Sequence, residues 1–200
     1  MKRRVGVVAC VAAIVFGMSP AMVGTASTEP ITTAKVKAGG ISVSYPARWV
    51  NLLVGAPNLK RAVKLAQKDN PKLTESDVLR LLLGAGPDSV FFAIDLRTGD
   101  YVNVKLHAFD LPDSTVDQFQ STLQTEAKRL GASGTLTVVA TTVDSQRAFR
   151  ADGVNGSTRV ASLYLAHPTT GHMVAITAAS ADNSKGTRVV NSIVQGVHIA

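Results

Sequence analysis

The chain has 200 residues, of which 46% are hydrophobic and 18% charged, and its formal net charge is +7. Three of the basic residues, Lys2, Arg3 and Arg4, stand at the N-terminus. Without them 18 basic residues face 14 acidic ones, a net charge of +4, which gives little support for nucleic-acid binding. The single cysteine, Cys10, excludes an intrachain disulfide, so a chain of this length must rely on its hydrophobic core.

The N-terminus has the pattern of an export signal. The basic residues precede an apolar run from Val5 to Met18, and the small residues Gly24-Thr25-Ala26 suit signal peptidase. As a helix this run would be roughly 21 Å long, short of the ~30 Å hydrocarbon core of a bilayer. We predict a signal peptide over residues 1–26, cleaved after Ala26, in preference to an uncleaved anchor. The protein is then secreted or held in the cell envelope.

Two variants of this signal are disfavoured. Val7-Val8-Ala9-Cys10 resembles a lipobox, but the apolar run continues beyond Cys10 instead of ending there, so we do not expect lipid anchoring. Arg3-Arg4 lacks the bulky residue that follows a twin-arginine signal, which favours the general secretory route. After cleavage the mature chain has no cysteine, and therefore no thiolate nucleophile and no cysteine metal ligand.

A short linker precedes the predicted domain. Residues 27–40 contain Thr, Ser, Pro, Lys and a Gly-Gly pair without periodicity, which predicts a flexible segment. Apolar residues alternate with serines over 41–46, which predicts a first strand and the start of a single domain over 41–200. Trp49, the only tryptophan, is expected as a large core residue beside this strand.

Two helices are predicted next. Pro57 suits the first turn of one helix, and Asn70-Pro71 ends it. Thr74 can cap the second helix, with Asp77 in the capping-box position, and Gly84-Ala85-Gly86-Pro87 ends that helix. The first helix places four cations on one face, namely Lys60, Arg61, Lys64 and Lys68.

Residues 88–108 predict a β-hairpin around which the sheet is organised. Apolar residues alternate on both sides of the Arg97–Asp100 turn. The first strand carries Phe91 and Phe92 on opposite faces, so we expect it to be central in the sheet. The second strand has one polar face, which we expect to meet water. The members of this polar strip are Tyr101, Asn103, Lys105 and His107.

The remaining elements complete an α+β order. Ser114 and Asp117 are expected to cap a third helix that extends to Leu130 and is closed by Gly131. Four strands follow at hairpin spacing, and a final amphipathic helix includes Val189 to Val197. We predict an antiparallel sheet covered by helices on both faces, an α/β/α sandwich. The four strands are expected over 136–143, 147–151, 159–166 and 173–179.

The opening of the domain carries a family resemblance. Ile41-Ser42-Val43-Ser44-Tyr45-Pro46 followed by Trp49 resembles the start of PsbP-like domains, whose element order is similar across nearly all of 41–200. The chain is also similar to the exported or lipid-anchored LpqN/LpqT-type family of mycobacteria and related actinobacteria. The resemblance implies a non-enzymatic envelope or extracellular module without cofactors, in which Tyr45, Pro46 and Trp49 mark the fold. The two-helix segment 57–83 and the poor lipobox depart from the family pattern.

Three groups of side chains are candidate sites. The basic face of the first helix could meet anionic lipid or an acidic envelope polymer, and the polar strip could contact a small ligand or a protein. A solvated face is the alternative explanation for each. His167 and His172 flank a four-residue loop and could face each other as metal ligands, although no third ligand is near in sequence. An exposed pair beside a turn is the alternative.

No pattern predicts catalysis. The sequence has no G-x-S-x-G elbow and no phosphate-binding glycine loop. Asp95 lies in a strand expected to be buried, where an Arg or Lys partner is the predicted arrangement, and Asp110 and Asp113 are expected to serve helix capping. We therefore predict a non-catalytic module that binds a protein partner or an apolar or lipid ligand. An apolar groove is expected where Leu81–Leu83 meets Phe91-Phe92, and a His-based metal protein or an envelope hydrolase is the alternative.

Overall fold

The computed structural model describes residues 31–36, 40–52, 59–129, 134–155, 158–181 and 183–199. The predicted signal peptide with Cys10, its cleavage site after Ala26, and the predicted boundary residues Pro57, Leu130 and Gly131 lie outside these residues. Among the helices within them, none is long and apolar enough to cross a membrane.

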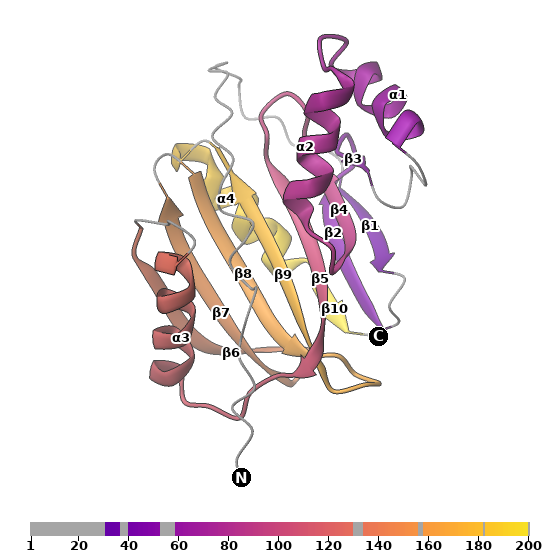
Figure 1. Cartoon of the computed structure of the whole chain (residues 1–200). Coiled ribbons are helices and arrows are strands. Elements are labelled where there is room, and N and C mark those ends of the chain that lie inside the picture. The colour runs from indigo at the N-terminus through magenta and orange to yellow at the C-terminus, as the bar shows by residue number, and fades with distance from the viewer. Residues whose placement is uncertain are drawn as a thin grey trace.

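The described strands form two antiparallel sheets (Figure 1). In spatial order, the larger sheet contains β3 (Val50–Asn51), β4 (Ser89–Ile94), β5 (Tyr101–Asp110), β9 (His172–Ser180), β8 (Thr158–Ala166), β7 (Gln146–Asn155) and β6 (Leu136–Val143). The smaller sheet contains β1 (Ile31–Val36), β2 (Ile41–Pro46) and β10 (Val197–Ile199).

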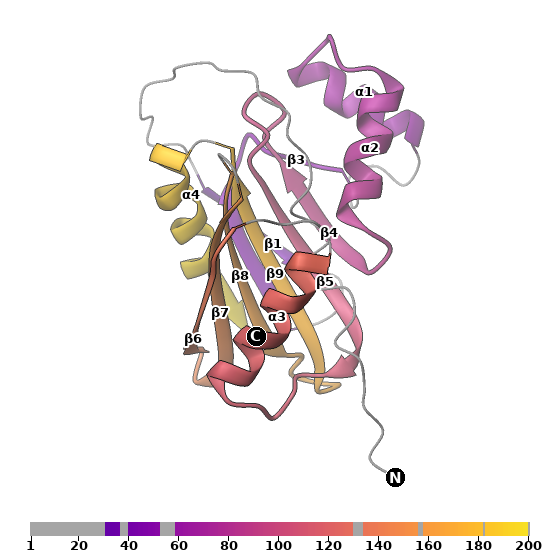
Figure 2. The ribbon, with the colours of Figure 1, turned by 60° about the vertical axis from the view of Figure 1, so that its left-hand side comes forward.

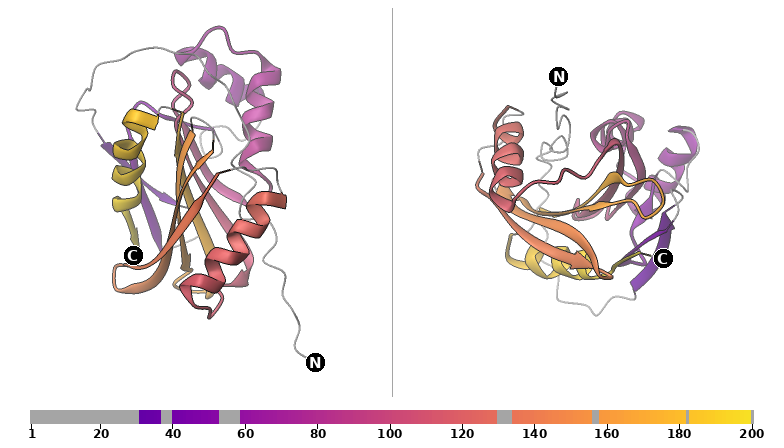
Figure 3. Two further views of the ribbon diagram at one scale, coloured as in Figure 1. Left: turned by 90° about the vertical axis from the view of Figure 1, so that its left-hand side faces the viewer. Right: turned by 90° about the horizontal axis from the view of Figure 1, so that it is seen from below.

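Helices cover both faces of the larger sheet. They are α1 (Leu59–Asp69), α2 (Glu75–Ala85), α3 (Val116–Arg129) and α4 (Asn183–Gln195). The α1–α2 pair and α3 lie on one face, and α4 with the smaller sheet lies on the other (Figures 2 and 3). The predicted fold class, a mixed α+β fold with a large antiparallel sheet and helices, is confirmed. The smaller sheet is an addition that the periodicity of the sequence does not predict.

Three apolar cores hold these layers together. The main core lies between the larger sheet and the smaller sheet with α4, and Trp49 belongs to it with 5% exposure, as predicted. A second core lies under α3, and a third lies under α1 and α2. Their largest buried members include Phe91, Ile176 and Ile193 in the first, Phe119, Leu123 and Phe149 in the second, and Leu52, Val78 and Phe92 in the third.

The predicted hairpin is confirmed, but its first strand, β4, lies next to the edge of the larger sheet and not at its centre as predicted. β4 pairs with β5 in antiparallel register, and the short strand β3 flanks β4 on its other side. In the turn, the backbone N–H of Asp95 donates to the carbonyl oxygen of Asp100 at 2.7 Å. Phe91 and Phe92 lie in different cores because successive side chains of a strand point to opposite faces. The predicted groove is therefore wrong in placing these two phenylalanines in one site.

The two predicted helix caps have different outcomes. Thr74 and Asp77 form the expected capping box, in which the Asp77 N–H donates to the Thr74 hydroxyl at 3.2 Å. The predicted cap of α3 is wrong by one residue: the Gln118 N–H donates to Oγ1 of Thr115, and the Thr115 N–H donates to Oε1 of Gln118 at 3.1 Å. Ser114 instead donates its N–H to the Pro112 carbonyl in the preceding turn.

The smaller sheet corrects two further predictions. β1 lies inside the predicted linker, because its residues pair with β2 from Ile31 opposite Pro46 to Val36 opposite Ile41. Val197 lies in β10 and not in the last helix. That helix ends before Gly196, whose backbone approaches β2 so closely that a Cβ there would lie 2.6 Å from the Cβ of Ser44. Cross-strand pairing, which local periodicity does not report, determines both segments.

Candidate functional site

The polar strip of β5 is buried. Asn103, Lys105 and His107 are 1%, 7% and 3% exposed, so the prediction that this face meets water is wrong. The strip lies on the same sheet face as the cores under α3 and under α1–α2, and Tyr101 packs partly into the latter core. Asn103 and Lys105 lie at the C-terminal end of α2.

Two members of the strip interact with backbone groups at the C-terminal end of α2. Nδ2 of Asn103 donates to the carbonyl oxygen of Ala85 at 2.9 Å. The hydroxyl of Ser89 contacts the same carbonyl and lies 2.8 Å from Oδ1 of Asn103. Nζ of Lys105 would be only 3.1 Å from a Cβ on Gly86, so its ammonium lies beside the negative end of the helix dipole. These residues attach α2 to the sheet.

His107 lies at the far end of the strip. Its Nδ1 is 4.0 Å from Oδ2 of Asp88, and its ring centroid is 5.0 Å from that of Phe109. Burial lowers the pKa of His107 below its usual 6.5, Lys105 lowers it further, and Asp88 partly opposes both. The imidazole is therefore neutral at pH 7. A role of the strip in ligand contact stays a prediction.

The two loop histidines lie opposite each other across the loop, as the spacing predicts, because the His167 N–H donates to the carbonyl oxygen of His172 at 2.7 Å. His167 is 4% exposed, and its Nδ1 accepts hydrogen bonds from the N–H groups of Thr169 and Thr170, each at 3.2 Å. These two hydrogen bonds use the lone pair of Nδ1 within the loop. In the antiparallel register of β5 and β9, His172 lies opposite Asp110. Within the described ranges, no group of three or more His, Cys, Asp or Glu residues is placed to hold a metal ion.

The basic face of α1 is exposed as the spacing predicts. Its opposite side packs into the third core through Ala62 and Ala66, which are 0% exposed. The four cations Lys60, Arg61, Lys64 and Lys68 all lie at exposed positions. Their assignment as partner-binding residues stays a prediction.

A second feature of the same helix pair escapes the sequence prediction. Leu79 and Leu83, one turn apart on α2, are 42% and 70% exposed, whereas Leu81 and Leu82 pack partly into the third core. Among the described residues, only one other large hydrophobic side chain, Val139, is comparably exposed. The i, i+4 spacing of Leu79 and Leu83 is the sequence signal that could have identified this pair. The leucine run is thus divided between a core face and an open face.

Charge is also concentrated in this pair. Residues 59–85 contain six basic and three acidic side chains, a net charge of +3. Residues 86–200 contain nine basic and ten acidic side chains, a net charge of −1. We call residues 59–85 the basic hairpin. The basic hairpin carries both a local positive charge and two exposed leucines.

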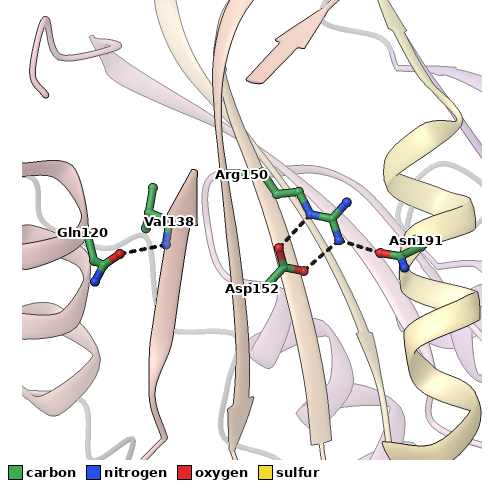
Figure 4. A network of polar contacts seen from close by, with 5 residues as sticks. All are labelled: Gln120, Val138, Arg150, Asp152 and Asn191. Atoms are coloured by element: carbon green, nitrogen blue, oxygen red, sulfur yellow. Dashed lines mark hydrogen bonds and ion pairs between the residues drawn. The ribbon is translucent and has the colours of Figure 1, made fainter. Parts of the chain in front are cut away.

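The other prominent ionic groups are internal contacts. Oδ2 of Asp95 lies 2.7 Å from Nη2 of Arg48, which confirms the predicted arginine partner. Arg150 of β7 binds Asp152 through two hydrogen bonds of 2.7 and 2.8 Å and also contacts Asn191 of α4 (Figure 4). This network attaches α4 to the sheet.

The two carboxylates predicted to serve helix capping are placed elsewhere. Asp110 is the last residue of β5. Asp113 accepts a hydrogen bond from Nη1 of Arg147 at 3.0 Å, which ties the loop before α3 to β7. The capping role of both is therefore wrong, because Thr115 and Gln118 provide the cap.

These features define an α+β domain with a PsbP-like fold. The solution structure of the cyanobacterial PsbP (CyanoP) from Synechocystis sp. PCC 6803 matches with a TM-score of 0.53 at 10% identity, covering 90% of this chain and 98% of that one. The Saccharomyces cerevisiae Ran-binding protein Mog1p has a TM-score of 0.49 at 7% identity, covering 86% and 96%. No protein-family model and no curated protein matches the sequence. At these identities the PsbP match establishes the fold and not the activity.

Proposed function

We propose that the protein is an exported, non-catalytic binding module of the cell envelope or extracellular space, related to the LpqN/LpqT-type proteins of actinobacteria. It binds a protein partner or an apolar or lipid ligand through its surface. The observation that carries this proposal is the basic hairpin, which presents charge and exposed leucines together on the outside of the fold. Cleavage after Ala26 would leave a mature chain that begins near Ser27.

The side chains that could support chemistry favour binding as well. His167 stabilises its own turn, Asp95 pairs with Arg48, and His107 is enclosed beside Asp88. None of these contacts places a base beside a hydroxyl nucleophile within the described residues, which is the arrangement that acyl transfer requires.

Two measurements test this proposal. Native mass spectrometry of the protein isolated from its own source should show a co-purifying lipid or a stoichiometric protein, and N-terminal sequencing should begin near Ser27. Turnover of an envelope substrate by the pure protein, abolished by one side-chain change, would contradict the non-catalytic assignment. A lipidated Cys10 or a start at Met1 would contradict cleavage after Ala26 and indicate a membrane anchor.

A further inference from the structure

We infer that the basic hairpin is a docking element for an anionic lipid surface, with the cations of α1 held at the headgroups and the leucines of α2 inserted among them. This inference rests on the proposed binding function and specifies the partner. It commits to lipid because the two neighbouring helices supply the two properties that an anionic bilayer interface matches, namely positive charge on α1 and exposed apolar side chains on α2.

The outward sides of α1 and α2 differ from the sides that pack into the core. The buried positions of α1 are Ala62 and Ala66, and those of α2 are Val78 and Ala85, so the shared core occupies one side of each helix. The cations of α1 and the leucines of α2 lie at exposed positions outside that core. In Figures 1 and 3 the two helices stand at one end of the larger sheet, beside β3 and β4. The hairpin thus lies at the outside of the fold.

Core packing does not account for the exposed leucines of α2. An isolated exposed leucine is ordinary, but two that are one helical turn apart on a helix with a separate buried face form an apolar stripe. The third core contains neither Leu79 nor Leu83. Their exposure therefore points to a partner.

The positive charge of α1 also favours an anionic surface. Lys or Arg near an anionic leaflet contributes about 1 kcal/mol each, which is about fivefold in affinity. The four cations of α1 lie within a helix whose only acidic residue is Asp69, at its last position. The remainder of the domain after Ala85 is slightly acidic and gives no comparable attraction. Attachment is therefore expected at the hairpin and not over the whole surface.

The test is co-sedimentation of the protein, isolated from its own source, with vesicles of phosphatidylglycerol and phosphatidylcholine or of phosphatidylcholine alone. We expect binding to the anionic vesicles, and loss of that binding at about 1 M salt, where the Debye length is about 3 Å. Changing all four cations of α1 to Gln should weaken binding at least about 50-fold. The double variant Leu79→Asn with Leu83→Asn should weaken it about tenfold.

Matched controls separate this surface from general charge and apolarity. Lys128→Gln with Arg129→Gln removes two exposed cations of α3, and Val139→Asn removes the other exposed large hydrophobic side chain. Both controls should bind within about twofold of the unchanged protein, and circular dichroism should show that every variant is folded. Equal loss in the controls and the hairpin variants, or no binding to anionic vesicles, would overturn the inference. If vesicles do not bind but the hairpin variants lose a co-purifying protein, the lipid assignment fails while the proposed binding function stands.

Discussion

The two helical covers on one face of the larger sheet differ in how they use their surfaces. α3 carries two acidic and two basic side chains, and its buried residues Phe119 and Leu123 belong to the second core. Its glutamines reach the edge strand β6, where Oε1 of Gln120 accepts from the Val138 N–H at 2.9 Å (Figure 4) and Oε1 of Gln124 accepts from the Leu136 N–H at 3.1 Å. These contacts protect backbone groups that an edge strand would otherwise leave open.

The basic hairpin uses its outward surface differently from α3. Apart from its cap and the contacts at the end of α2, it is attached mainly through apolar packing, and it leaves charges and leucines outside. Covering a sheet requires only one side of a helix. The composition of the other side therefore indicates any further role of that helix. On α3 that side is polar and ordinary, whereas on the hairpin it carries the features of a contact surface.

A buried residue of α3 and an exposed leucine of the basic hairpin should differ most in their contribution to stability. Phe119 stacks on Phe149 with ring centroids 4.4 Å apart and packs edge-on against Tyr164 at 5.2 Å. Phe119→Ala should lower the free energy of unfolding by about 3–5 kcal/mol, because it opens a cavity in the second core. Leu83→Asn should change it by less than about 0.5 kcal/mol. Urea unfolding monitored by circular dichroism measures both, and a comparable loss for Leu83→Asn would show that this leucine is structural.

The contacts of the α3 glutamines with β6 should give the next largest effect on stability. Changing Gln120 and Gln124 together to Ala should cost about 2 kcal/mol, since two partly buried backbone N–H groups lose their acceptors at about 1 kcal/mol each. Hydrogen exchange at Leu136 and Val138 should accelerate in the same variant. An exposed glutamine of α4, Gln195, provides the control. If Gln195→Ala has the same effect, the contacts to β6 have no specific role.

The corrected cap of α3 gives a smaller effect. Thr115→Ala should destabilise by about 1 kcal/mol, similar to Thr74→Ala at the start of α2. Ser114→Ala should be neutral or slightly stabilising, because the Ser114 hydroxyl is buried without a described partner. The reverse order in urea unfolding would restore Ser114 as the cap.

The pH dependence of His107 is the smallest effect. Its pKa is lowered in the folded state, so the unfolded chain binds the proton more readily at acidic pH. The stability that follows is fully present above about pH 6.5 and decreases as the pH falls through the lower folded pKa. An NMR titration should give a pKa below 6.5 for His107, and His107→Gln should reduce the loss of stability over this range. A pKa above 6.5 would indicate that Asp88 outweighs the burial.

Elements with strong local signals could be predicted from the sequence. The β4–β5 hairpin, the Thr74 capping box and the strand β6 from Leu136 to Val143 agree with the structure because alternation and capping chemistry specify them locally. The strands β1 and β10 could not be predicted, since β1 has no periodic apolar pattern, β10 has only three residues, and both form by pairing with β2.

The candidate site was predictable in part. Helical spacing identifies the cations of α1 as one face. It does not show that the polar face of β5 is covered, because covering depends on where the end of α2 lies in three dimensions. The exposed pair Leu79 and Leu83 was hidden within an apolar run that divides between two sides of the helix.

Chemical labelling of lysines shows whether the basic hairpin contacts an anionic membrane. The protein should be acetylated with and without phosphatidylglycerol vesicles, and the modified lysines should be quantified by mass spectrometry. We expect vesicles to protect Lys60, Lys64 and Lys68 while leaving Lys128 on α3 unchanged. Equal protection of Lys128, or no protection of the α1 lysines by vesicles that bind the protein, would contradict the assignment of the basic hairpin as the docking surface.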